Sequence, residues 1–494
     1  MTTALGNAAR SSGLSFVGAV VSAAAGFALS LVLARMLGPA GSGIVFQMIS
    51  VFTIAGAVAR LGLDTTAVWL LPRLAADSRN DVRRAVRILL AGAMLGGVLT
   101  GVVLWAIAPL LGAGSDDLAT VTRLAAAFMP FASVATVALA ITRGLGGVRD
   151  YVVLGSIGLP VGRLAVVSVA TAFLASAVVA SVAWLAVLVV IALLALWVVR
   201  RAMQRFQVAD RHTSPRAELI KRIAAFGAPR TLSSTIEQAL LWLDVLIVGL
   251  IAGPAAAGVY GVVSRLVQAG TIPSTSMRIV VAPQFSRMMH QGRLAELSEF
   301  YTRTTQWIVL FSVPVYAALA VFAHPVLTLF GPGFEEGATA LVIMCAGAVV
   351  SASTGNVQSL LLMSGRSGWA ALNKVIVLAV SLTLLFTLVP GMGIIGAAIA
   401  WTISMSLDAV LATIQVRIAA KVRAGLGGVG LALVVAGCAT AVPAVAMRLV
   451  LGDTVIAMII GVVLAVAAFV ILLYVTRRRF AIDEFSSLLR RKPQ

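Results

Sequence analysis

Charged residues are scarce in this chain, because Asp, Glu, Lys and Arg make up only 11% of its 494 residues. A typical soluble domain has about 25%. Hydrophobic residues reach 60%, and apolar runs of the roughly 20 residues that cross a bilayer follow one another almost end to end. The alternation with period two that a transmembrane barrel needs is absent. These features predict an all-α, polytopic membrane protein.

Metal ligands and disulfide-forming residues are also scarce. The two cysteines, Cys345 and Cys438, each lie inside an apolar run, and the three histidines, His212, His290 and His324, are far apart. This pattern gives neither a disulfide framework nor a metal-ligand cluster. We therefore expect no metal, no cofactor and no metalloenzyme.

Long loops are missing as well, and the longest covers about residues 200–222. A membrane enzyme such as a glycan ligase or polymerase usually needs a large outer loop with catalytic residues, so we expect no enzyme. The start "MTTALGNAARSSGLSF" has no clear small-residue cleavage motif, which favours an uncleaved first helix.

Hydropathy predicts about fourteen spans. They cover residues 14–37, 43–66, 88–111, 118–142, 152–175, 178–199, 223–250, 256–279, 304–323, 337–362, 369–389, 393–416, 427–449 and 454–475. We expect an N-lobe over residues 1–200, a cytoplasmic linker over 201–222 and a C-lobe over 223–424. The last two spans and a basic tail occupy 425–494.

The net charge of +19 has two interpretations. In a soluble protein it would favour nucleic-acid binding. Here the basic residues gather in every second connection and in the tail, whereas the other connections are short and contain several acids. Because Lys and Arg accumulate on the cytoplasmic side, we predict both termini to be cytoplasmic and expect no nucleic-acid partner.

Two similar turns, "GPAGSG" from Gly38 and "GPAAAG" from Gly253, lie in different halves of the chain. After the second turn, polar residues follow one helical face from Tyr260 to Thr275. At the matching positions, the helix after the first turn has polar or small residues only in its lower part. Tight turns alone explain a single such loop. Two loops in matching positions indicate parallel repeats, which place a binding site near the midplane of the membrane.

Charged side chains inside predicted spans are functional candidates, because each costs roughly 2.5–3.5 kcal/mol at the bilayer centre. The candidates for a substrate cavity are Arg60, Arg163, Arg265, Gln268 and Thr271. The candidate coupling or ion-pair acids are Asp64, Glu237, Asp244 and Asp408.

Structural roles compete with each of these assignments. Arg60 and Asp64, four residues apart on one predicted helix, could be a local ion pair at the interface. Glu237 and Asp244 could bind a proton or sodium ion, or pair with arginines across the bundle. Asp408 could bind a coupling ion or make a helix–helix hydrogen bond.

Three stretches resemble one family. "LARMLGPAGSGIVFQMISVFTIAGAVARLGLDTTAVWLLPR" resembles the opening of the polysaccharide (Wzx-type) flippases of the multidrug/oligosaccharidyl-lipid/polysaccharide (MOP) exporter superfamily. "LTLFGPGFEEGATALVIMCAGAVVSASTGNVQSLLLMSGRSGWAALNKVIVLAV" resembles its spans ten and eleven, and "VPGMGIIGAAIAWTIS" its span twelve.

The resemblance implies two MATE-like, pseudo-symmetric six-helix lobes around a central cavity, with a further C-terminal helix pair. It implies alternating access in a bacterial plasma membrane and a polyprenyl-diphosphate-linked oligosaccharide as substrate. In relatives, cationic residues line the cavity, and Arg60 and Arg265 fit that pattern by position. Glu237 and Asp244 depart from it.

The sequence leaves three other functions open: a MATE-type cation or drug antiporter, a flippase for a peptidoglycan lipid precursor, and an inert scaffold. It does not decide whether protons, sodium ions or the membrane potential drive transport. The expected partners are the lipid-linked glycan, membrane lipids and other polysaccharide-assembly proteins of the membrane, with a monomer as the functional unit.

Overall fold

The computed structural model describes residues 2–77, 79–112, 116–204, 215–422, 425–476 and 479–480. Within these residues every regular element is a helix. The predicted linker over 201–222 falls partly outside them, at residues 205–214, and the basic tail falls outside them from residue 481.

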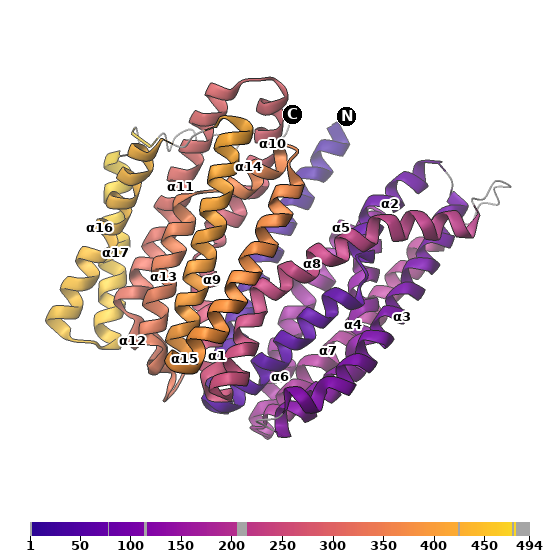
Figure 1. Ribbon diagram of the computed structural model, residues 1–494, viewed down its shortest axis with the longest axis horizontal. Helices are drawn as coiled ribbons and strands as arrows, with labels where there is room; N and C mark the ends of the chain where they lie inside the picture. The colour runs from indigo at the N-terminus through magenta and orange to yellow at the C-terminus, as the bar shows by residue number, and fades with distance from the viewer. Residues whose placement is uncertain are drawn as a thin grey trace. The chain divides into compact units, whose positions relative to one another are not determined.

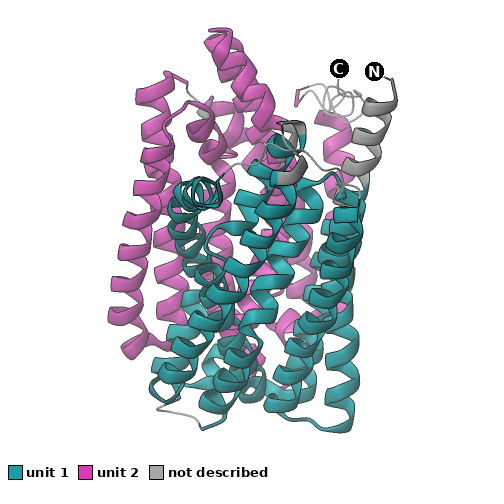
Figure 2. Cartoon of the chain, turned by 90° about the vertical axis from the view of Figure 1, so that its right-hand side faces the viewer, with its two compact units in different colours: residues 1–258, 493 teal, residues 259–492, 494 magenta. Residues whose placement is uncertain are grey.

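The described chain divides into two compact units, residues 1–258 and 259–492 (Figure 2). The helices of the first are α1 Thr2–Ala59, α2 Leu63–Asp77, α3 Arg79–Leu111, α4 Asp116–Gly144, α5 Val148–Tyr151, the π-helix η1 Val152–Gly158, α6 Leu159–Phe173, α7 Ala177–Gln204 and α8 Arg216–Ala252.

Helix α9, Pro254–Ala269, begins at the end of the first unit and continues into the second. The second unit also contains α10 Ile272–His290, α11 Leu294–Val321, α12 Ala323–Thr328, the 3-10 helix η2 Phe334–Gly337, α13 Ala338–Ser353, α14 Val357–Met363, α15 Ser367–Ala420, α16 Leu426–Leu451 and α17 Val455–Thr476 (Figure 1).

Eleven of the described segments are long and apolar enough to cross a membrane. Two of them are double-length, Val17–Ala75 and Ser367–Ala420, and each changes direction at a glycine with positive φ, Gly38 (φ 67°) or Gly393 (φ 55°). Glycine reaches this conformation without the steric cost that a side chain imposes. These kinks lie at the predicted turns, while the count of fourteen spans and the cytoplasmic termini stay predictions.

Helix α3 packs closely against α4 through small residues. A Cβ atom on Gly97 would lie 2.6 Å from the Cα atom of Pro130, and one on Gly101 would lie 2.7 Å from the carbonyl oxygen of Ala126. In a bilayer the lipid is as apolar as the helix, so association depends on close van der Waals contact rather than on removal from water. Gly97 and Gly101 therefore allow the backbones of α3 and α4 to approach each other closely.

Helix α8 packs against α1 and α2 in the first unit. Near its start, Phe226 stacks on Trp69 of α2, with 4.5 Å between the ring centroids. Most of α8 belongs to the predicted C-lobe over 223–424, yet the helix lies in the first unit. The division into an N-lobe, a linker and a C-lobe stays a prediction.

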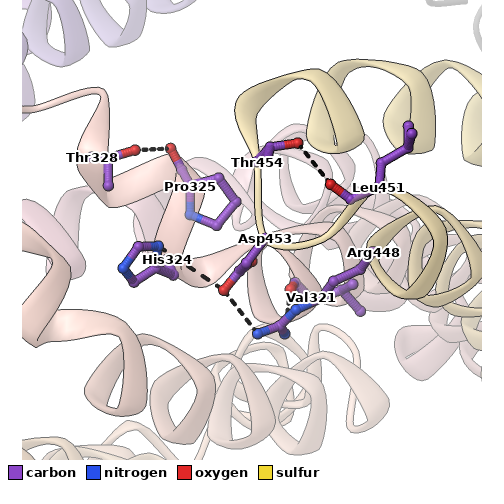
Figure 3. Close-up of polar contacts among 8 residues, drawn as sticks. All are labelled: Val321, His324, Pro325, Thr328, Arg448, Leu451, Asp453 and Thr454. Carbon is purple, nitrogen blue, oxygen red and sulfur yellow. Dashed lines mark hydrogen bonds and ion pairs between the residues drawn. The ribbon is translucent and has the colours of Figure 1, made fainter.

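Helices α16 and α17 (yellow in Figure 1) form a pair that packs on α11. Where α16 turns into α17, Arg448 donates a hydrogen bond to the carbonyl of Val321 (2.8 Å) and pairs with Asp453 at 3.0 Å (Figure 3). His324 lies 4.0 Å from the same carboxylate. Midway along α11, the Trp307 indole donates to the carbonyl of Phe480 (2.8 Å).

Candidate functional site

The predicted span over 43–66 is not one continuous helix. It breaks at residues 60–62 between α1 and α2, where both Leu61 (φ 49°) and Gly62 (φ 64°) adopt the left-handed conformation. The carbonyl of Ala59, at the end of α1, accepts a hydrogen bond from Ser133 Oγ of α4 (3.1 Å). The break is therefore supported by a neighbouring helix rather than frayed.

This break corrects the prediction for Arg60 and Asp64. They do not lie one turn apart on a single helix, because Arg60 follows α1 while Asp64 lies in the first turn of α2. The Asp64 carboxylate accepts the amide N–H of Thr65 (2.8 Å). A carboxylate is stabilised at a helix N-terminus by the unpaired amides and the helix dipole, so Asp64 has a structural role in starting α2.

Arg230 of α8 lies beside the break and was missed in the sequence. Its Cβ would be 3.1 Å from a Cβ atom built on Gly62, and its guanidinium lies 3.7 Å from the Glu237 carboxylate. The sequence signal for this pair is the spacing of seven residues between Arg230 and Glu237, which puts a basic and an acidic side chain on one face of a helix. Glu237 therefore has a cationic partner on its own helix.

The second acid of α8, Asp244, is in a different environment from Glu237. Its residue is only 8% exposed, and its carboxylate accepts the N–H of Val245 (2.8 Å). The Glu237 side chain is 51% exposed. The two acids are two turns apart, but one is buried against neighbouring helices while the other lies on an accessible face.

Arg163 lies in α6, just after the π-helical residues 152–158. Pro160 has no amide hydrogen to donate, and a proline in a helix commonly goes with such local irregularity. The guanidinium of Arg163 lies over the Trp184 ring of α7, 3.4 Å from its centroid, and Phe52 of α1 meets the same ring edge-on. Trp184 of α7 and Phe52 of α1, which we call the aromatic shelf, thus hold the Arg163 side chain in place.

Arg163 has no acidic residue on the helices that α6 mainly packs against. Its Nε atom is buried and has no hydrogen-bond partner among the described residues. The elements that α6 mainly packs against, α1, η1 and α7, contain no aspartate or glutamate. Arg163 is half-buried, and a cation partly removed from water without a counter-charge is costly, so this geometry favours an anionic ligand that approaches Arg163.

Arg265, Gln268 and Thr271 lie together in the second unit, where α9 ends. The Arg265 guanidinium donates to the Gln268 side chain (3.1 Å), and Thr271 Oγ1 donates to the Gln268 carbonyl (2.7 Å). Helix α9 stops at Ala269, and a Cβ atom on Gly270 would overlap the ring of Tyr316. The predicted span over 256–279 is therefore interrupted at 270–271.

Asp408 forms an ion pair with Lys374, which lies on the antiparallel half of α15, at 2.6 Å. Next to them, the side-chain amides of Asn373 and Gln415 exchange two hydrogen bonds of 2.7 Å. The buried Oδ1 atom of Asp408 has no hydrogen-bond partner among the described residues. The structure thus provides the helix–helix contact that competed with ion binding in the sequence.

The candidates fall into both units. Arg60, Asp64, Arg163, Glu237 and Asp244 belong to the first unit, and Arg265, Gln268, Thr271 and Asp408 to the second. Among the described residues, no group of three or more His, Cys, Asp or Glu could hold a metal ion. The available chemistry is that of guanidinium groups beside amides and hydroxyls, which suits an oxyanion.

The family described as "polysaccharide biosynthesis protein" matches residues 8–289, more than half of the chain. The chain belongs to this family. Its long apolar helices and this membership make it a multi-pass membrane protein.

Two relatives of this family member have names that mention glycans. It is 24% identical over 178 residues to a protein of Haloferax volcanii named as a low-salt glycan biosynthesis flippase, covering 34% of this chain and 36% of that one. It is 27% identical over 194 residues to a Shigella flexneri protein provisionally named as an O-antigen transporter, covering 39% and 46%. The chain thus spans less than half the length of these relatives.

Two solved structures share the fold of this family member. The lipid II flippase MurJ in an inward closed conformation has a TM-score of 0.73 and 11% identity, covering 95% of this chain and 99% of that one. An inward-facing MATE-family multidrug transporter of the MOP superfamily has a TM-score of 0.63 and 16% identity, covering 80% and 94%. At these identities the likeness concerns the fold alone.

Proposed function

We propose that this protein is a flippase that moves a polyprenyl-diphosphate-linked oligosaccharide, a precursor of a cell-surface polysaccharide, across the bacterial plasma membrane by alternating access. The observation that carries the proposal is Arg163, a guanidinium on an aromatic shelf with no acid on the helices around it. Family membership and the names of two relatives point to the same class of cargo.

The chemistry of a diphosphate fits these residues. A diphosphate cannot cross hydrocarbon unaided, whereas a guanidinium offers a planar fork of donors that matches phosphate oxygens and keeps its charge at any cellular pH. We assign Arg60, Arg163 and Arg265 to diphosphate binding, Arg230 to the same group, and Gln268 and Thr271 to glycan hydroxyls. The polyprenyl chain stays in the lipid.

A cation antiporter has less support. Its sequence argument rested on acids inside the membrane, and the structure pairs Glu237 with Arg230 and Asp408 with Lys374. Asp64 lies at a helix N-terminus. These contacts give each of the three acids a partner within the protein, so none of them needs a transported cation.

Depletion of the protein in its native host tests the proposal. Glycan-loaded polyprenyl diphosphate should accumulate on the cytoplasmic face, and the intact gene should reverse the accumulation. Arg163→Ala should fail to reverse it although the protein inserts normally. The matched control is Arg201→Ala, because Arg201 stacks on Trp197 at 3.8 Å near the end of α7 and is exposed.

Three results would contradict the proposal. Normal export of the surface glycan without the protein, in a strain with no second copy, would exclude it. A block in peptidoglycan synthesis without a surface-glycan defect would favour a peptidoglycan-precursor flippase instead. Drug sensitivity without any glycan defect would favour a MATE-type antiporter.

A further inference from the structure

The two Gly-Pro turns contact each other directly. A Cβ atom on Gly43 would overlap the carbonyl oxygen of Pro254, and a Cβ atom on Gly258 would overlap the carbonyl oxygen of Pro39. All four residues belong to the first unit. We call residues 38–43 and 253–258 together the glycine clasp.

The clasp is symmetric in sequence as well as in space. The step along the chain from Gly43 to Gly258 equals the step from Pro39 to Pro254. Each glycine therefore meets the proline carbonyl of the other copy, which is the reciprocal pattern of a two-fold contact. The kink glycines also match, with φ 67° and ψ −175° at Gly38 and φ 91° and ψ 167° at Gly253.

Four residues further along α1, the side chain of Gln47 lies against Gly249, which is four residues before Gly253. A Cβ atom on Gly249 would overlap the side-chain amide of Gln47. Gln47 is 0% exposed, and neither its amide oxygen nor its amide nitrogen has a hydrogen-bond partner among the described residues. A buried amide without partners is costly, and the cost disappears when water or another polar group reaches it. The structure thus has a tight contact and, beside it, a group that is stabilised when the contact opens.

We propose that the glycine clasp is the outer gate of the transport cycle, and that the unpaired amide of Gln47 limits how long the gate stays closed. This rests on the proposed transport function, because only a cavity that opens alternately to both sides needs such a gate. The closest approaches in the contact are to backbone carbonyls, and the small Ser42 side chain lies beside Gly258, so no long side chain has to change rotamer when the two turns separate. In the open state, water satisfies the amide of Gln47.

The gate can be tested by thiol labelling in intact cells with a membrane-impermeant maleimide. Cys345 and Cys438 are the only native cysteines, so the background is Cys345→Ala with Cys438→Ser. Thr53→Cys is the reporter, since Thr53 is half-buried and lies ten residues beyond Gly43, about 15 Å along the helix. Its labelling rate measures how often the gate opens.

Gly43→Ala and Gly258→Ala should each raise the labelling rate roughly tenfold, because the added carbon overlaps the opposing carbonyl and the clasp cannot close. The matched control is Gly26→Ala on the same helix, where a Cβ atom meets nothing within 4 Å. Gln47→Met should lower the rate about fivefold, because a side chain of similar volume replaces the unpaired amide.

Opposite shifts for the glycine and Gln47 variants, with correct insertion, would establish the gate. If the inserted glycine variants label at the rate of Gly26→Ala, the clasp is only a packing contact and the proposal is wrong. Should a glycine variant fail to insert, Gln47→Met still decides, since it adds no atom at the clasp and labelling at the parental rate contradicts the proposal. The assay uses no substrate, so failure of the glycan-accumulation test removes the proposed cargo without changing these rates.

Discussion

At the scale of single residues, what matters most is where a charge finds its partner. Arg163 has an aromatic ring on one face and a buried Nε atom without a partner in the described chain. Asp408 has an ammonium group at 2.6 Å. The first arrangement leaves donors available to a ligand, whereas the second is neutralised within the protein.

We expect Arg163→Lys to reduce transport by about tenfold or more while the protein inserts at normal levels. Lysine keeps the charge but has neither the planar fork that binds two phosphate oxygens nor the flat surface that stacks on Trp184. Complementation of surface-glycan export in a depleted strain measures the effect. Full complementation by Arg163→Lys would show that a point charge is enough and would remove the argument for bidentate binding.

The ion pair of Lys374 and Asp408 gives a second prediction. Lys374→Met should lower stability by about 3 kcal/mol, because it leaves the Asp408 carboxylate, only 11% exposed, without its partner. Asp408→Asn should cost less, because the Lys374 side chain is 31% exposed and water can reach it. The double variant should recover most of the loss, as judged by thermal unfolding in detergent. If the double variant is stable and transports normally, Asp408 has no coupling role; if it is stable and inactive, a role in coupling gains support.

At the scale of elements, the break between α1 and α2 stores a local conformational cost. Leu61 has a positive φ of 49°, which costs a side-chain-bearing residue roughly 1–2 kcal/mol. Ser133 and the close approach of α8 at Gly227 hold the segment in place. A discontinuous helix at membrane depth is tolerated where neighbouring helices satisfy the freed backbone groups.

Substitutions at the break should act in opposite directions. Leu61→Gly should raise stability by up to about 1 kcal/mol, since glycine adopts positive φ without strain. Gly62→Ala should destabilise, because its φ is 64° and the new Cβ would overlap the Gly227 carbonyl. Gly56→Ala is the control, as its Cβ meets nothing within 4 Å. If Gly62→Ala unfolds at the same temperature as this control, the break does not require glycine at position 62 and the prediction is wrong.

At the scale of the whole molecule, polar contacts at the end and at the middle of α11 tie the last described segments to the rest of the second unit. Arg448 and Asp453 join the turn between α16 and α17 to the end of α11 (Figure 3). Trp307 holds the backbone of Phe480, which is 1% exposed. The C-terminal helix pair is therefore attached by hydrogen bonds as well as by apolar packing.

Arg448→Ala should loosen the turn between α16 and α17 without preventing insertion. The side chains of Arg448 and Asp453 are 44% and 34% exposed, so their ion pair contributes at most about 1 kcal/mol, and global stability should change little. Hydrogen exchange of residues 451–454 should become faster, while exchange in α13 stays unchanged. Unchanged exchange at the turn would mean that apolar packing alone holds the pair.

The sequence by itself determined the membrane class, the approximate positions of the helices and the two matching turns. It could do so because hydropathy is a property of contiguous residues, and because a bilayer forces each apolar run of sufficient length into a helix. Arg163 was identifiable for the same reason, as a charge far from the ends of its span.

Only the tertiary structure decided which charges have partners and which helices are interrupted. Lys374 and Asp408 are many helical turns apart along the chain, so no local pattern joins them. Arg230 lies beside Gly62 because α8 packs against the break between α1 and α2. The contact between Gly43 and Pro254 exists because segments from different halves of the sequence approach within backbone distance. Hydropathy contains no information about such approaches, since they depend on how the helices pack and not on how apolar each one is.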